Sequence, residues 1–144
     1  MPVANIHVLV GHPKPVLKAM LTDFAATFAR LMGAPVDRLQ VWVTEVDPEL
    51  YVIAGELAAD CLQRQSHGET ENPFIRMALM EGRPPELLHE VMATLSALVA
   101  RHLGGDPKRV RVQIDQVHPD RWAIGGVPAS ISRAAEIARM SATA

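Results

Sequence analysis

The chain has 144 residues, a length typical of one domain, and 49% of them are hydrophobic, which is enough for a buried core. A formal net charge of −2, with acids and bases mixed along the chain, excludes the basic surface of a nucleic-acid-binding protein. The single cysteine excludes a disulfide framework, and no apolar run resembles a signal peptide or approaches the ~20 residues of a membrane span. We therefore expect a cytoplasmic protein that binds neither nucleic acid nor membranes.

The first half of the chain reads as strand, helix, strand. Residues 3–10 alternate in hydrophobicity as a half-buried strand does, and Gly11 ends the run. Pro13 and Pro15 suit the first turn of a helix, where a missing N–H costs nothing. The apolar stripe of that helix comprises Leu17, Met20, Leu21, Phe24, Phe28 and Leu31. Gly33 ends the helix, and residues 39–43 begin a second strand.

A linker and a second strand–helix–strand unit follow. We expect the linker, residues 56–72, to start with a short helix and to end in an exposed polar loop at 66–72. The second unit has strands at 74–81 and 110–117 around a helix at 85–103, again bounded by glycines. The tail from residue 128 has some helical spacing and no assigned role.

The two halves are copies of one another. A shift of 71 residues aligns 2–55 with 73–126 without a gap and gives 14 identities in 54 pairs, among them Pro2 with Pro73 and Arg38 with Arg109. We interpret the chain as a single domain, 1–144, made of repeat one (2–55), the linker (56–72), repeat two (73–126) and a tail (127–144).

A strand–helix–strand unit with this crossover makes a parallel pair of strands. The expected fold is therefore α+β: two fused β-α-β repeats that form a four-stranded mixed sheet with two helices on one face. The other face is expected to stay apolar and to need a cover, which an oligomer would supply.

The second residue can carry chemistry. Removal of Met1, which a small second residue generally permits, would leave Pro2 with a free secondary amine. An ordinary α-amino group titrates near ~7.7–8.0, and burial beside cations lowers that pKa. Pro2 would then serve as a general base at neutral pH.

Several short motifs resemble the tautomerase superfamily, and within it the 4-oxalocrotonate tautomerase group. Repeat two carries Pro73, the sequence Met-Glu-Gly-Arg that ends at Arg83, Val-Arg-Val around Arg111, and Trp-Ala-Ile-Gly-Gly from Trp122. Repeat one carries Pro2 and counterparts of these motifs, so the resemblance covers 2–55 and 73–126. Short members of this family are single units that assemble as hexamers, so a fused double unit implies a homotrimer.

The resemblance also implies a chemistry: keto–enol tautomerisation of a small 2-oxo or 2-hydroxydienoate acid. Pro2 takes the position of the general base, whereas Pro73 lies within the chain and has no basic nitrogen. Arg83 takes the position of the arginine that binds the substrate carboxylate, and the same position in repeat one is His12. If the first strands of the two units pair antiparallel, Pro2 meets Arg83 and Pro73 meets His12.

A second arginine of the family corresponds to Arg111 in repeat two and to Gln40 in repeat one, and it comes from a neighbouring subunit. We favour Arg111 as the residue that faces Pro2. The apolar aromatic wall corresponds to Trp122 or Tyr51. His12 and Gln40 remain candidates for substrate binding.

The other polar residues suggest no second chemistry. The six histidines lack the spacing of metal ligands, so we expect neither a metal nor a cofactor. Charged residues in the loops, including Arg38 and Arg109, are expected to be solvated.

Two alternatives stay open at this stage. A lyase that uses the same proline, such as a hydratase-dehalogenase or a decarboxylase, would need a carboxylate to activate water near the last turn, where this chain has the apolar Ile124; Glu45, Asp47, Asp115 and Asp120 are possible substitutes. A non-catalytic trimer that binds a ligand or partner would keep Pro2 only by descent.

Overall fold

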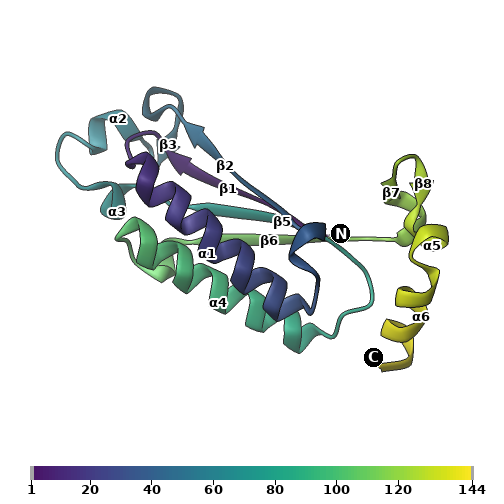
Figure 1. The fold of residues 1–144 in the computed structure, drawn as a ribbon. Helices are drawn as coiled ribbons and strands as arrows, with labels where there is room; N and C mark the ends of the chain where they lie inside the picture. Colours follow the sequence, from purple (N-terminus) through teal and green to yellow (C-terminus); the bar gives the residue numbers. More distant parts are fainter. Residues whose placement is uncertain (1, 144) are drawn as a thin grey trace.

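The computed structural model describes residues 2–143, so the expected loss of Met1 lies outside the described residues. Six long elements build the fold: β1 (Val3–Leu9), α1 (Lys14–Met32), β2 (Gln40–Val46), β5 (Phe74–Met80), α4 (Pro85–Leu103) and β6 (Arg111–Val117). The four strands form one sheet in the order β2-β1-β5-β6. The outer pairs, β1 with β2 and β5 with β6, are parallel, and the central pair β1–β5 is antiparallel. The predicted α+β fold with a mixed sheet is confirmed (Figure 1).

The helices begin and end where the sequence indicated. Proline lies in the first turn of both α1 and α4. Both helices end at a glycine in the left-handed conformation, Gly33 at φ 61° and Gly104 at φ 72°, where a residue with a Cβ would be strained.

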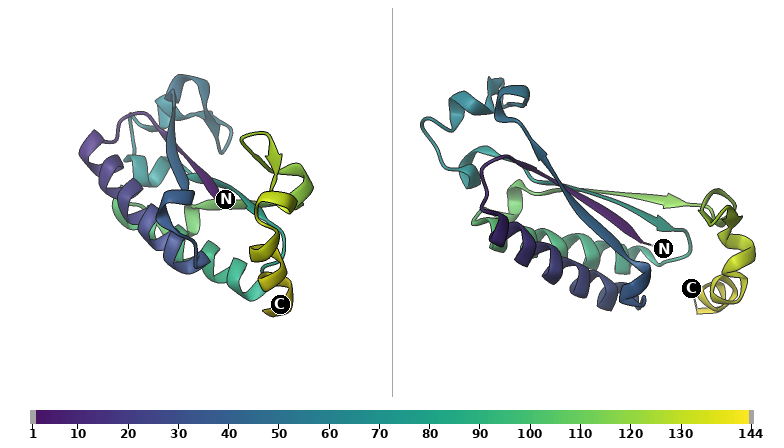
Figure 2. Two further views of the ribbon diagram at one scale, coloured as in Figure 1. Left: turned by 45° about the vertical axis from the view of Figure 1, so that its right-hand side comes forward. Right: turned by 45° about the horizontal axis from the view of Figure 1, so that its top comes forward.

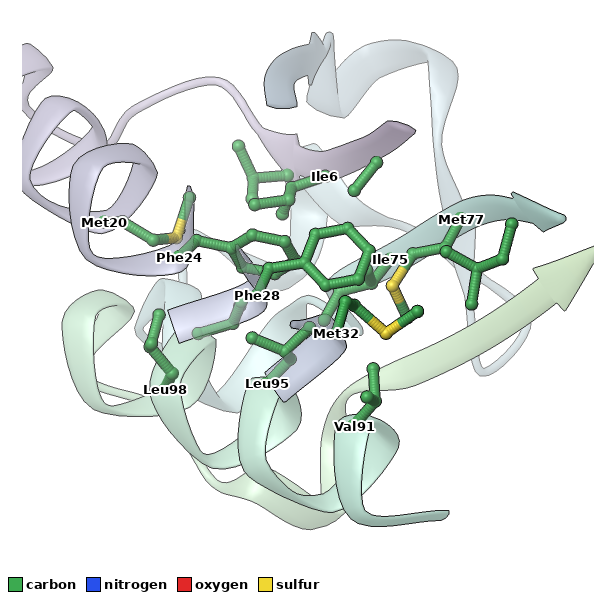
Figure 3. Packing of buried hydrophobic residues seen from close by; sticks show 14 of the residues in the cluster. Ile6, Met20, Phe24, Phe28, Met32, Ile75, Met77, Val91, Leu95 and Leu98 are labelled. Atoms are coloured by element: carbon green, nitrogen blue, oxygen red, sulfur yellow. The ribbon is translucent and has the colours of Figure 1, made fainter. Parts of the chain in front are cut away.

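The core lies between the sheet and the helix pair. Helices α1 and α4 run side by side over one face of the sheet (Figure 1). Alternate residues of the two central strands meet them: Ala4, Ile6 and Val8 from β1, and Ile75, Met77 and Leu79 from β5. Phe24 and Phe28 of α1 contact each other edge to face, with ring centroids 5.8 Å apart, in the middle of this layer (Figure 3).

The second face of the sheet is not the apolar surface that we expected. Asn5 and Thr44 lie on it and are joined by a 3.0 Å hydrogen bond, and Arg76 lies 3.7 Å from Asp115. The alternation that puts Ile6 and Val8 against the helices puts polar residues on the opposite side. The face is therefore mixed, because Val3, Phe74 and Trp42 also lie on it, and Trp42 is 43% exposed.

The linker corrects another expectation. It holds two short helices, α2 (Ala58–Cys61) and α3 (His67–Thr70), and the hairpin strand β4 (Glu56–Leu57), which pairs with β3 (Val52–Ile53). Residues 66–72 are not simply an exposed loop, because Thr70 and Glu71 are each only 2% exposed.

The chain ends in a separate arm. A second hairpin, β7 (Ala123–Ile124) with β8 (Val127–Pro128), leads into α5 (Ala129–Ser132) and α6 (Ala134–Thr143). Its turn residues Gly125 and Gly126 have φ of 59° and 83°, the left-handed conformation that tight hairpin turns require. The arm lies beyond the end of the sheet at which the chain begins (Figures 1 and 2).

Candidate functional site

The antiparallel pairing of β1 with β5 brings Pro2 to the end of the partner strand. Val3 is opposite Ala78, so Pro2 lies beside the last residues of β5, and Arg83 follows three residues after that strand. Both residues line one cavity of about 460 Å³. Pro2 itself is buried. The proximity of Pro2 and Arg83, which the repeat argument anticipated, is therefore present within a single chain.

Arg83 is the central cation of this cavity. Its side chain is partly buried, and Nη1 donates a 3.2 Å hydrogen bond to the carbonyl of Met80. Burial lowers the pKa of the Arg83 guanidinium from its ordinary value. A guanidinium nevertheless stays charged in proteins. No carboxylate within residues 2–143 forms an ion pair with it, so its charge faces the cavity without compensation.

In the other half of the chain, a side chain of the protein itself occupies the place next to the counterpart of Arg83. His12, the counterpart of Arg83, has Nε2 2.5 Å from Oε1 of Glu71, and the backbone N–H of Leu9 donates to the other carboxylate oxygen at 2.8 Å. The side chains of His12 and Glu71 are only 6% and 2% exposed. This half therefore holds an internal carboxylate beside the buried Pro73.

The remaining candidates lie elsewhere. Tyr51 and Arg111 border a different hollow of about 450 Å³, at the end of the sheet where β5 and β6 begin. Tyr51 Oη donates to the carbonyl of Asn72 at 3.5 Å, and Arg111 Nη1 donates to that of Lys108 at 3.0 Å.

Gln40 and Trp122 are also outside the Pro2 cavity. The backbone N–H of Gln40 donates to the carbonyl of Pro2 at 3.3 Å, while the residue is exposed and is not among the cavity lining. Trp122 belongs to the C-terminal arm, where its carbonyl accepts from Ala129. Of the candidate residues, Pro2 and Arg83 share one cavity, and Tyr51 and Arg111 share the other.

The sequence analysis missed part of the cavity wall. Arg38, expected to be a solvated loop residue, is partly buried and lines the cavity, where Nη1 lies 2.5 Å from Oε1 of Glu136. Glu136 belongs to α6, as do three further lining residues: Ile137, Arg139 and Met140. In the sequence, the only sign that Arg38 has a structural role was its identity with Arg109 at the same position of the second repeat. The pKa of Glu136 is lowered, mainly by its hydrogen bond from Arg38.

Two further searches of the described residues concern metal binding and membrane spans. No group of three or more His, Cys, Asp or Glu side chains between residues 2 and 143 is arranged to hold a metal ion. Over the same range, none of the helices combines the length and apolar character that crossing a bilayer requires.

Comparison with known proteins identifies relatives for the fold and for repeat two. The family model described as "Tautomerase enzyme" matches residues 73–130. A probable tautomerase of Staphylococcus epidermidis is 31% identical over 55 residues, which cover 38% of this chain and 90% of that protein. A probable tautomerase of Ralstonia nicotianae is 33% identical over 61 residues, or 42% of this chain and 87% of that protein.

Solved structures extend the similarity over both repeats. The crystal structure of a native fused 4-OT superposes with a TM-score of 0.80 at 23% identity and covers 91% of this chain and 99% of that one. At this level of identity, the structural similarity supports the fold and leaves the activity to be argued from the site.

Proposed function

Because the chain belongs to the tautomerase superfamily, we propose that it is a keto–enol tautomerase that uses the amino-terminal nitrogen of Pro2 as general base. The substrate class is a small 2-oxo or 2-hydroxydienoate acid. The observation that carries the proposal is the contrast between the two halves: an open cavity joins Pro2 and Arg83, whereas Glu71 fills the equivalent place beside Pro73 and His12.

The contacts of Glu71 in the half that contains Pro73 suggest how a substrate binds in the half that contains Pro2. The carboxylate of Glu71 accepts from His12 and from the backbone N–H of Leu9. The repeat maps His12 onto Arg83, so a substrate carboxylate in the open half accepts from the Arg83 guanidinium. A guanidinium can donate two parallel hydrogen bonds to a carboxylate, which fixes the orientation as well as the position of the substrate.

The proton transfer follows from this placement. The lone pair of Pro2 takes the proton of the enol oxygen and delivers it to a carbon of the conjugated system, so the enol becomes the ketone and no atom is lost. Positive charge from Arg83 stabilises the enolate that forms between the two steps. Cations and low solvent access both favour the neutral amine, as a general base requires.

The other candidate residues enter this proposal through assembly. Fused 4-OT structures are described as symmetric and asymmetric trimers. A homotrimer of this chain would cover the second face of its sheet and allow Arg111 of one copy to approach the Pro2 cavity of another. The same packing would supply Tyr51 or Trp122 as the apolar wall.

The test compares two matched prolines. Ketonisation of 2-hydroxymuconate and of phenylenolpyruvate is followed by ultraviolet absorbance, after intact mass shows that Met1 is absent. Pro2→Ala should lower kcat by about 10²- to 10⁴-fold, the usual contribution of a general base. Pro73→Ala, at the equivalent buried position, should keep the wild-type rate. Equal, near-background rates for wild type and Pro2→Ala would refute the proposal.

A further inference from the structure

The structural repeat continues beyond the sequence repeat, into the linker and the C-terminal arm. At the same shift of 71 residues, the hairpin β3–β4 corresponds to β7–β8, and α2 corresponds to α5. The two copies diverge after these elements, because the linker continues through α3 to Pro73 whereas the arm continues as α6. The tail therefore begins as a second copy of the linker and lies at the opposite end of the sheet, near Pro2 (Figures 1 and 2).

The linker shows what such a segment does beside a proline. Arg109 donates hydrogen bonds to the carbonyls of Thr70 and Glu71, at 2.9 and 3.1 Å. Both of these residues are buried, and so is Pro73, which follows them. The arginine thus anchors the segment that covers the proline.

Helix α6 takes the corresponding place at Pro2. The counterpart arginine, Arg38, forms an ion pair with Glu136 of α6. On another side of the cavity, Met140 contacts the turn after β5, because a Cβ at Gly82 would stand only 3.3 Å from Met140 Cε. The helix is therefore in contact with both repeats where it borders the cavity.

The face that α6 presents to the cavity is partly apolar. Ile137 and Met140 line the cavity, and both are partly buried. The repeats add the apolar side chains of Met32 and Met80 to the same lining. Low access of water disfavours the protonated form of an amine, so this wall favours a neutral Pro2.

The charged side chains in the lining do not titrate near neutral pH. They are Arg38, Arg83, Glu136 and Arg139. Guanidinium groups stay charged in proteins. The hydrogen bond from Arg38 lowers the pKa of Glu136 below its ordinary 4.5. For the described residues of this cavity, a transition between pH 6 and 9 therefore reports the amine of Pro2.

We propose that Ile137 forms an apolar wall that keeps the Pro2 amine neutral, and that the ion pair of Arg38 with Glu136 positions this wall. The proposal rests on the proposed function and assigns it two positioning elements. The family resemblance expects an aromatic residue in this role, which a neighbouring copy would have to supply. Helix α6 provides an apolar wall from the same chain.

Titration of the amine provides the first test. Nitrogen-15 NMR of protein labelled at proline follows Pro2, after intact mass shows that Met1 is absent. Ile137→Gln admits water without changing the charge, so it should raise the pKa of the amine by about one unit. Ile131→Gln, at a position 69% exposed on α5, is the matched control and should leave this pKa unchanged. An amine pKa that is the same in Ile137→Gln as in wild type would overturn the role of Ile137.

Exchanging the charges of the ion pair tests its positioning role. Glu136→Arg places two arginines together and should displace α6, which raises the pKa of the Pro2 amine. If α6 stayed in place, the added positive charge would lower that pKa instead. Arg38→Glu in the same chain restores the pair with its charges exchanged and should return the pKa to its wild-type value. A lower or unchanged pKa in Glu136→Arg, or no return in the double variant, would overturn this role.

Turnover connects the wall with the chemistry. One unit of pKa is a tenfold change in the neutral fraction at low pH, so Ile137→Gln should lower kcat/KM by about tenfold at pH 6 and by less than about twofold at pH 9. An equal loss at both pH values would contradict the proposal.

The NMR titration needs no turnover, so it separates this inference from the proposed function. If the pKa of the amine depends on Ile137 while Pro2→Ala leaves ketonisation intact, the wall stands and the tautomerase mechanism fails. If Pro2→Ala abolishes ketonisation and the pKa does not depend on Ile137, the proposed function stands and the wall fails.

Discussion

The buried pair of His12 and Glu71 makes a strong prediction about stability. Glu71→Ala would remove a carboxylate that is 2% exposed and that accepts hydrogen bonds from both His12 and the backbone of Leu9. Two polar groups would then be left without this acceptor in a largely buried site. A buried polar group left without its hydrogen-bond partner costs about 1–3 kcal/mol, so the two groups together cost about 2–6 kcal/mol.

This loss is large enough to measure in a chain of this size. At about 2–4 °C per kcal/mol for domains slightly larger than this one, the melting temperature should fall by roughly 4–24 °C. Urea unfolding at fixed protein concentration gives the free energy directly, and fixing the concentration removes any contribution from assembly. The matched control is Glu90→Ala, at an exposed position on α4, which should change the free energy by less than about 0.5 kcal/mol.

A double-mutant cycle then tests the contact itself. If His12 and Glu71 stabilise the fold through each other, the losses of His12→Ala and Glu71→Ala should not add, and the coupling should exceed about 0.5 kcal/mol. Glu71→Gln, which keeps one acceptor oxygen, should lose less than Glu71→Ala. The reasoning is refuted if Glu71→Ala is no more destabilising than Glu90→Ala.

Three further predictions concern titratable groups. The rate of ketonisation should rise with pH as the Pro2 amine loses its proton, with a midpoint below the ~7.7–8.0 of an ordinary α-amine; a pH–rate profile that is flat from pH 5 to 9 would contradict it. The ion pair with Arg38 lowers the pKa of Glu136 below its ordinary 4.5, so this pair stabilises the docked α6 above that pH and its contribution is lost as the pH falls through the lowered value. Because both side chains are about one-third exposed, the loss should be at most about 1 kcal/mol, and hydrogen exchange of the α6 amides on acidification should detect it. The hydrogen bond to Glu56, and to a smaller extent burial, raise the pKa of the Cys61 thiol. The native protein should therefore react slowly with iodoacetamide at pH 7.4, and the Glu56→Gln variant should react faster.

The sequence was sufficient for the sheet and for the first contact of the candidate site. Period-two and period-3.6 patterns located the strands and helices, because each of these elements buries one face. The internal repeat then predicted how the two units meet. If their first strands pair antiparallel, the start of one strand lies beside the end of the other. The proximity of Pro2 to Arg83 follows from that geometry alone.

The failures share a different physical cause. Glu71 lies in a polar segment and was expected to be exposed, but its partner His12 is 59 residues away and no local pattern reports it. Arg38 was taken for a solvated residue because its partner Glu136 is 98 residues away, on a helix outside the repeat. The polar residues on the second face of the sheet, such as Asn5 and Arg76, alternate with apolar ones, so the apolar pattern alone did not reveal them. Buried charges depend on a single distant partner, whereas apolar faces depend on many neighbours and leave a periodic signal.

The same contrast explains why a chain with two similar halves presents one open candidate site. Fusion turns the second proline into an amide, which removes its basicity, and it also places a chain segment directly before that proline. Anchored by Arg109, this segment brings Glu71 within hydrogen-bond distance of His12, the counterpart of Arg83. At the first proline the equivalent Arg38 instead binds Glu136 of α6. His12 thus has an acceptor within the chain, whereas Arg83 forms no ion pair with a carboxylate of residues 2–143.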